Sequence, residues 1–148
     1  MTVSRHLADV EATEAAGAAL APTLADGAIV ALDGPLGAGK TSFARGLAMA
    51  FGVPEHAITS PSFTLVVEHE LPDGRLLRHV DAWRLHGCED LSTLGWDEWA
   101  GADGTITVVE WASRIEPALG EHVLRVALDY DGSGRMLSMA SPLDGALQ

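Results

Sequence analysis

Short apolar runs and alternating apolar and polar residues predict a framework of β-strands. Residues 28–33 and 105–109 are nearly continuous apolar runs, typical of buried strands. Asp73-Gly74 lies between two β-like runs and indicates a hairpin with a two-residue turn, because both residues accept positive φ angles. Two hairpins are therefore expected, Phe63–Leu71 with Arg75–Asp81 and His122–Asp129 with Arg135–Ala140.

Two helices are predicted from the same pattern. Asp9–Leu24 is rich in alanine and leucine and predicts a first helix, disturbed at Pro22. Lys40–Phe51 predicts a second helix, because Gly52 directly after it suits the left-handed position that ends many helices. Helices mixed with buried strands and hairpins predict an α/β fold whose sheet combines parallel and antiparallel strands.

The composition is that of a folded domain of ordinary size. The chain has 148 residues, of which 47% are hydrophobic, and shows no repeat or linker-like stretch, so one domain spanning residues 1–148 is expected. No run approaches the roughly 20 apolar residues that span a bilayer. A single cysteine, Cys88, excludes an internal disulfide and suits a reducing compartment. These features predict a cytoplasmic protein with no membrane contact.

The charge argues against a protein that binds nucleic acid by itself. Nine basic and 21 acidic residues give a net charge of -12, whereas such proteins usually make about 6–10 cationic contacts to phosphates. Arg75, Arg78 and Arg84 form the one basic cluster, which we interpret as a solvated strand face, with a minor contact to RNA left open. Lys40 is the only lysine of the chain.

A phosphate-binding motif contains that lysine. Residues 34–41 (GPLGAGKT) match G-x-x-x-x-G-K-[ST] between a predicted strand and a predicted helix. In this motif the backbone N–H groups and the lysine hold phosphates, and the threonine hydroxyl binds Mg²⁺. The fold expected is therefore a P-loop NTPase-like three-layer sandwich with a mixed central sheet. The expected ATP-binding residues of the loop are Gly37, Ala38, Gly39, Lys40, Thr41 and Ser42.

Two acidic residues at strand ends are candidates for metal or water chemistry. Asp81 and Glu110 each follow a β-like run, and the run before Glu110 resembles a Walker-B strand. A solvated strand-end acid is the alternative for both. The chain contains no asparagine, which excludes an Asn-Lys-x-Asp element for guanine and makes ATP the default nucleotide.

Four motifs together resemble the TsaE (YjeE) family, small bacterial P-loop ATPases of tRNA threonylcarbamoyladenosine modification. Their order is kept over nearly the whole chain, which is far more specific than a P-loop alone. Departures include Pro35 in place of an aspartate and Trp83 in place of a tyrosine. The matching segments are residues 34–41 (G-D-L-G-A-G-K-T in the family), 60–66 (S-P-T-[FY]-T-L-V), 79–85 (H-F-D-L-Y-R-L) and 109–111 ([IV]-E-W).

The resemblance implies roles for individual residues. Thr41 and Glu110 would hold Mg²⁺, and Asp81 and Lys40 would be catalytic. Weaker matches place Thr13 and Arg135 at the nucleotide. A switch and partner-sensing group would consist of Ser60, Ser62, Thr64 and Trp111.

The resemblance also implies an Mg²⁺-dependent, slow ATPase that works with the TsaB and TsaD proteins and meets tRNA mainly through them. Two alternatives remain open: a small-molecule P-loop kinase, and a non-hydrolytic binding module gated by a nucleotide.

The histidines and tryptophans allow further readings. His79, His86 and Cys88 lack the paired spacing of a structural zinc site, so surface or ordinary packing roles are expected. Trp96 and Trp99 are expected in the core, with an exposed partner anchor as the alternative.

Overall fold

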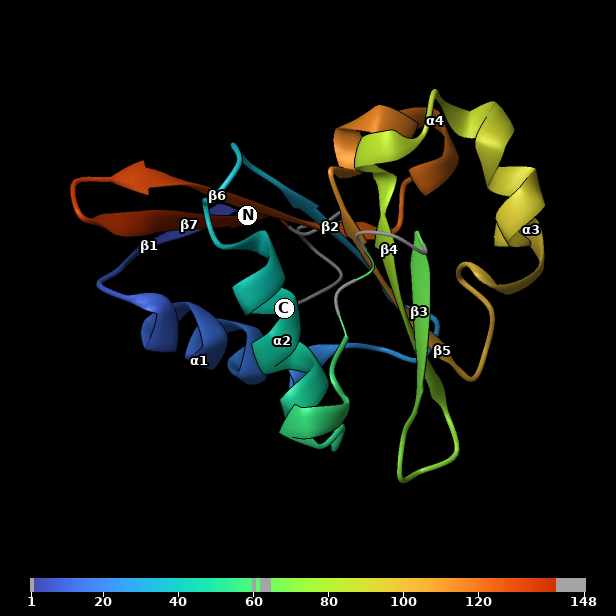
Figure 1. The fold of residues 1–148 in the computed structure, drawn as a ribbon, viewed down its shortest axis with the longest axis horizontal. Helices are drawn as coiled ribbons and strands as arrows, with labels where there is room; N and C mark the ends of the chain where they lie inside the picture. Colours follow the sequence, from blue (N-terminus) through green and yellow to red (C-terminus); the bar gives the residue numbers. More distant parts are fainter. Residues whose placement is uncertain (1, 60, 62–64, 141–148) are drawn as a thin grey trace.

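A seven-stranded mixed sheet forms the centre of the computed structural model, which describes residues 2–59, 61 and 65–140 (Figure 1). The strand order is β1-β7-β6-β2-β5-β4-β3. Strands β6, β2, β5 and β4 run parallel, whereas β7, β1 and β3 are antiparallel to their neighbours, as predicted for a mixed sheet. The strands are β1 (Thr2–Leu7), β2 (Ile29–Asp33), β3 (Val66–Glu70), β4 (Leu76–Asp81), β5 (Thr105–Glu110), β6 (Val123–Asp131) and β7 (Gly134–Ala140).

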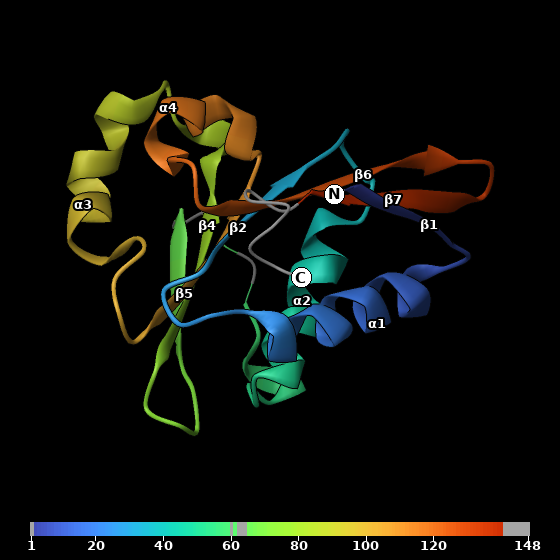
Figure 2. The same ribbon diagram turned by 180° about the vertical axis from the view of Figure 1, so that it is seen from behind.

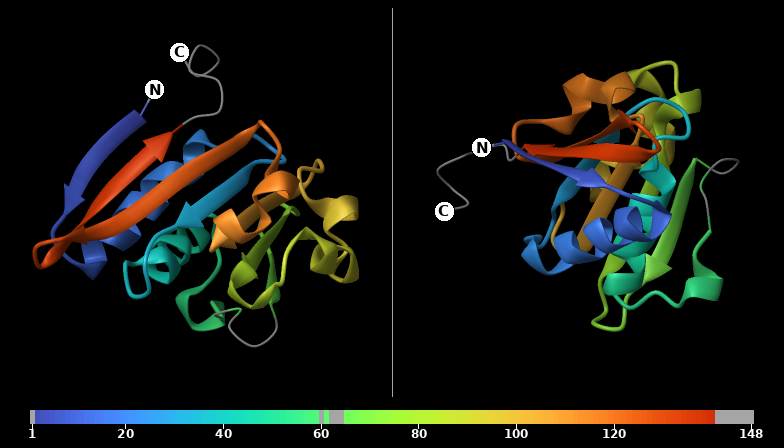
Figure 3. Two further views of the ribbon diagram at one scale, coloured as in Figure 1. Left: turned by 90° about the horizontal axis from the view of Figure 1, so that it is seen from above. Right: turned by 90° about the vertical axis from the view of Figure 1, so that its left-hand side faces the viewer.

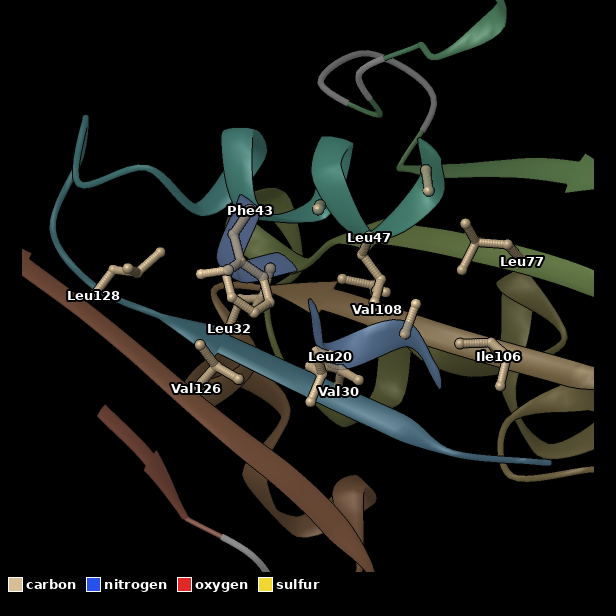
Figure 4. Packing of buried hydrophobic residues seen from close by; sticks show 14 of the residues in the cluster. Leu20, Val30, Leu32, Phe43, Leu47, Leu77, Ile106, Val108, Val126 and Leu128 are labelled. Carbon is tan, nitrogen blue, oxygen red and sulfur yellow. The ribbon is translucent and has the colours of Figure 1, made fainter. Parts of the chain in front are cut away.

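Helical segments cover both faces of this sheet, which confirms the three-layer α/β arrangement (Figure 2). Alternate residues of β2 show the two layers: Val30 and Leu32 pack with α1 and α2 (Figure 4), and Ile29 and Ala31 pack with α3 and α4. The segments are α1 (Val10–Leu20), α2 (Lys40–Ala50), α3 (Trp96–Trp99), α4 (Glu116–Leu119), and the 3₁₀ helices η1 (Ala21–Thr23), η2 (Glu55–Ala57), η3 (Ala82–Arg84), η4 (Cys88–Leu94) and η5 (Ala112–Ile115).

The two predicted helices form with small adjustments. Helix α1 ends at Leu20 and continues as the 3₁₀ turn η1, which contains Pro22. Helix α2 ends at Ala50, and Gly52 follows with a φ of 102°, as the C-terminal signal predicted. None of the described helices combines the length and apolar character that a membrane crossing requires.

Glycines allow α1 and α2 to pack backbone to backbone. A Cβ at Gly17 of α1 would overlap the carbonyl oxygen of Phe43, and a Cβ at Gly46 of α2 would overlap that of Glu14. This close approach brings α1 against the start of α2, where the phosphate-binding motif lies.

Strand β1 was not predicted. Its residues are exposed except Leu7, so its sequence carries no buried periodicity. It is stabilised by antiparallel pairing with β7, from Thr2 opposite Ala140 to Leu7 opposite Arg135. Figure 3 shows β1 as the outermost strand on its side of the sheet.

The β3–β4 hairpin is confirmed, but the predicted two-residue turn is wrong. The Gly74 N–H donates to the carbonyl of Leu71, and the Leu71 N–H donates to the carbonyl of Arg75. The loop therefore has three residues, and only Gly74 has a positive φ, since Pro72 fixes a negative one. Strand β3 begins at Val66; the predicted start at residue 63 lies outside the described residues.

One surface interpretation is corrected, and one core prediction is confirmed. Arg78 is not part of a solvated face, because its Nε lies 2.6 Å from Glu68 Oε2 and its guanidinium stacks 4.8 Å from the centre of the Trp99 ring. Trp96 is buried and meets Trp99 edge to face at 5.5 Å, so this pair belongs to the core rather than to an exposed anchor.

Candidate functional site

The loop of residues 34–39 connects β2 to α2 at the sheet edge where β4 and β5 also end. Gly34 has a φ of 153°, and a Cβ there would overlap the carbonyl oxygen of Leu128, so only glycine fits. Gly39 precedes α2 with a φ of 109° and offers no side-chain cap. The N–H groups of residues 39–42 therefore have no partner within the helix, which is the arrangement that binds anions at many helix starts.

Hydrogen bonds hold the carbonyl groups of this loop. Four consecutive carbonyls, those of residues 34–37, accept side-chain donors. The Lys40 ammonium donates to the first two at 2.6 and 3.0 Å, and the Tyr130 hydroxyl donates to the third. The Arg135 guanidinium donates to the fourth at 3.1 Å. The β6–β7 hairpin thus fixes the outer side of the loop.

Lys40 is buried between the loop and an aromatic ring. Its Nζ lies 3.9 Å from the centre of the Trp111 ring. Burial lowers the pKa of Lys40, and the nearby charges of Glu110, Asp33 and Asp81 oppose that shift. An ammonium at a helix start that feels the charge of three carboxylates is suited to contact a polyanion that arrives with a divalent cation.

Thr41, Glu110 and His79 form a chain of side-chain contacts. The Thr41 hydroxyl donates to Glu110 Oε1 at 3.0 Å, and Glu110 Oε2 lies 2.6 Å from His79 Nε2. Glu110 and His79 are buried, whereas Thr41 is exposed. The sequence predicted Thr41 and Glu110 but treated His79 as surface or packing; its place on the same face of β4 as Asp81, two residues away, is the signal that could have found it.

Asp81 lies beside this chain of contacts. It is directly opposite Glu110 in the parallel pairing of β4 with β5, so both predicted strand-end acids lie at the edge that holds the loop. Asp81 is half-buried, and its Oδ1 accepts the N–H of Trp83 at 3.0 Å.

These side chains fit a magnesium ion in chemical type. A threonine hydroxyl and a carboxylate lie in contact, with a second carboxylate on the neighbouring strand, and Mg²⁺ binds through oxygen, usually one or two carboxylates plus phosphate and water. No group of three or more His, Cys, Asp or Glu side chains suited to a metal ion occurs among the described residues, so the fit rests on one hydroxyl and two carboxylates, with phosphate and water as the other ligands.

Of the remaining predicted residues, Thr13 and Ser42 lie close to the loop, and the others lie outside the described residues. Thr13 is buried next to the loop, with its Cγ2 3.3 Å from the position that a Cβ would take at Gly39. Ser42 lies half-buried in the first turn of α2. The predicted switch residues Ser60, Ser62 and Thr64 lie outside the described residues.

Two tryptophans extend the site toward the surface. Trp111 follows β5 with a φ of 58°, and its ring packs 4.4 Å from that of Trp83, which is half exposed. The guanidinium of Arg114 stacks on the Trp83 ring, 4.5 Å from its centre. The Ser113 N–H donates to Asp33 Oδ1 at 3.0 Å and ties this turn to the end of β2.

Comparisons with known proteins agree with this architecture. Residues 7–137 match the family model described as "Threonylcarbamoyl adenosine biosynthesis protein TsaE". The chain is similar to the tRNA threonylcarbamoyladenosine biosynthesis proteins TsaE of Nostoc (36% identical, covering 93% of this chain and 85% of that protein) and Treponema pallidum (39%, covering 76% and 80%). The crystal structure of Bacillus subtilis YdiB matches with a TM-score of 0.77 and 29% identity, over 99% of this chain and 91% of that one.

The match to the family model, residues 7–137, includes the P-loop, both strand-end acids and the Trp111 turn. The chain therefore belongs to the TsaE family of tRNA threonylcarbamoyladenosine biosynthesis proteins.

Proposed function

We propose that this chain binds Mg²⁺-ATP and hydrolyses it slowly, and that hydrolysis supports threonylcarbamoyladenosine formation together with TsaB and TsaD. The observation that carries the proposal is the 3.0 Å contact between Thr41 Oγ1 and Glu110 Oε1. It supports the proposal because a threonine hydroxyl and a carboxylate lie side by side at the start of α2, where the Lys40 ammonium contacts the loop.

The loop geometry supports phosphate binding. The N–H groups at the start of α2 and the ammonium of Lys40 would hold the β- and γ-phosphates. Lys40 already donates to two loop carbonyls, so it exchanges neutral acceptors for charged phosphate oxygens, which form stronger hydrogen bonds.

Thr41 and Glu110 would hold the metal. When bound, Mg²⁺ neutralises charge on the β- and γ-phosphate oxygens. The buried carboxylate of Glu110 gains a compensating positive charge in this arrangement, while Thr41 fixes one of its oxygens.

Hydrolysis proceeds by in-line attack of water. A bond forms between the water oxygen and the γ-phosphorus while the bond to the β–γ bridging oxygen breaks, giving ADP and phosphate, with the proton released to solvent. Asp81 is proposed to orient that water, because its carboxylate lies next to Glu110 in register and is half-buried. Lys40 and the helix start stabilise the charge of the transition state.

The family and the charge support the proposed partners. A chain with a net charge of -12 is not built to hold tRNA alone, so we propose that tRNA contact belongs mainly to TsaB and TsaD, in the cytoplasm. The nucleotide state would be read through the segment containing Ser60, Ser62 and Thr64 and through Trp111.

The test measures ATP binding by calorimetry and phosphate release, with and without TsaB and TsaD. The expected result is Mg²⁺-dependent binding, slow release by the chain alone and faster release with both partners. Binding without any phosphate release under either condition would support a nucleotide-gated binding module instead. Transfer of phosphate to a metabolite in a panel of small molecules would support a kinase.

A further inference from the structure

We propose that His79 is a positioning residue for the magnesium site, acting through Glu110; the proposal rests on the proposed function. Glu110 uses its two oxygens differently: Oε1 accepts from Thr41 at 3.0 Å, and Oε2 lies 2.6 Å from His79 Nε2. His79 contacts the oxygen that Thr41 does not, so it acts on the carboxylate rather than as a metal ligand.

The sheet register explains why these side chains meet. Glu110 is opposite Asp81, and His79 is opposite Val108. His79 is therefore a diagonal neighbour of Glu110 on the same face of adjacent strands. Both side chains are almost fully buried, with 8% and 6% of their surface exposed, which leaves the carboxylate little solvent to satisfy Oε2 in place of the imidazole.

A nearby histidine shows that burial on this face does not by itself require a carboxylate. His69 of β3 is also buried, opposite Leu77, and its Nε2 has no hydrogen-bond partner among the described residues. The contact of His79 is therefore specific to its position beside Glu110. The imidazole fixes the rotation of the carboxylate and keeps Oε1 directed toward Thr41.

This arrangement predicts that losing the His79 contact lowers the affinity for Mg²⁺ and leaves the metal-free affinity for the nucleotide unchanged. Partners that orient a ligating carboxylate typically change metal affinity by about 10- to 100-fold. Removing the His79 contact should raise the Mg²⁺ concentration needed for half-maximal ADP binding by that factor. ADP affinity measured with a chelator in place of Mg²⁺ should stay within about twofold, because the loop and Lys40 are untouched.

The experiment titrates ADP into the full chain by calorimetry over a series of Mg²⁺ concentrations and in a chelator. His79→Gln keeps an N–H donor near the place of Nε2 and should keep most of the metal response. The asparagine of His79→Asn is also polar but is too short to reach Glu110, so this variant should lose the metal response. His69→Leu is the matched control on the same face, and thermal unfolding reports the fold of every variant.

Each outcome has a distinct reading. Loss of the metal response in His79→Asn, with recovery in His79→Gln, supports the proposal. Equal behaviour of these two variants, or equal loss of ADP affinity with Mg²⁺ and with chelator, overturns it and leaves His79 a packing residue. If the unmodified chain itself shows no Mg²⁺-dependent ADP binding, the proposed function fails instead.

Discussion

The ammonium of Lys40 lies 3.9 Å from the centre of the Trp111 ring, so the only lysine of the chain contacts both the phosphate loop and an indole. A cation at this distance is attracted to the ring face and perturbs its electronic environment. Phosphates that draw Lys40 toward themselves therefore change the surroundings of Trp111.

Replacing Trp111 should remove most of the change in tryptophan fluorescence on nucleotide binding. We expect Trp111→Phe to remove most of the change in tryptophan emission on adding Mg²⁺-ATP, because this indole contacts the ammonium. Trp96→Phe is the control, since Trp96 is buried beside Trp99. The emission change is measured by fluorescence titration. If Trp111→Phe shows the full change, Lys40 does not move away from Trp111 when the nucleotide binds.

Replacing Lys40 should weaken ATP binding. Hydrogen bonds to charged groups contribute about 1.5–3 kcal/mol, which is about 10- to 150-fold in affinity. We expect Lys40→Ala to lose this amount in calorimetry and Lys40→Arg to recover little of it, because a planar guanidinium cannot occupy the compact place of an ammonium. Arg45→Ala, in the same helix but paired with Glu55, is the control and should bind normally. Wild-type affinity in Lys40→Ala would reject the assignment.

Neutralising the strand-end acids should reduce turnover more than stability. We expect Glu110→Gln and Asp81→Asn each to lower phosphate release by about 100-fold or more, since both alter the charge around the reacting phosphate. Glu116→Gln removes an exposed carboxylate that pairs with Arg125 and should leave the rate unchanged. Rates are measured with TsaB and TsaD present, and unfolding curves check the fold. Normal rates in both acid variants would contradict their roles.

The contact between α1 and α2 should make one alanine substitution unfavourable. Gly to Ala within a helix normally stabilises it by about 1 kcal/mol. At Gly46 the added Cβ would overlap the Glu14 carbonyl, so we expect Gly46→Ala to lower the unfolding free energy by about 1–3 kcal/mol in urea titration. Met49→Ala, at an exposed position of the same helix, should change it little. A more stable Gly46→Ala protein would show that the helices separate easily.

His69 should lower the stability of the folded chain in mild acid. Burial, and next the charge of His79, lower the pKa of His69 below its ordinary 6.5. Below that value the unfolded chain takes up a proton that the folded chain refuses, so stability falls as the pH falls. We expect His69→Leu to lose less stability than the unmodified chain between about pH 7.5 and about pH 5.5. Urea unfolding at both values checks this, and equal losses would contradict it.

The loop and the acids could be predicted because their signals are local. The P-loop motif, the apolar run before Glu110 and the glycine after α2 each lie within a few residues, and the structure forms the strand and helix ends that they indicate. That Asp81 and Glu110 share one edge of the sheet follows from two parallel strands ending together.

The rest depends on pairing between distant segments, which a hydrophobic pattern does not encode. Strand β1 forms because β7 offers an edge some 130 residues further along the chain. His79 meets Glu110 only through the register of β4 with β5. Tyr130 reaches the loop from the β6–β7 hairpin. In each case the partner, rather than the residue itself, determines the role.

The bonds from Tyr130 and Arg135 to the loop carbonyls have a mechanical consequence. The β6–β7 hairpin is hydrogen-bonded to β1 at the outer edge of the sheet, so a protein bound at this edge would act on the proposed ATP site without touching it. A protein bound at this edge would thereby raise or lower the affinity of the proposed site for ATP from a distance.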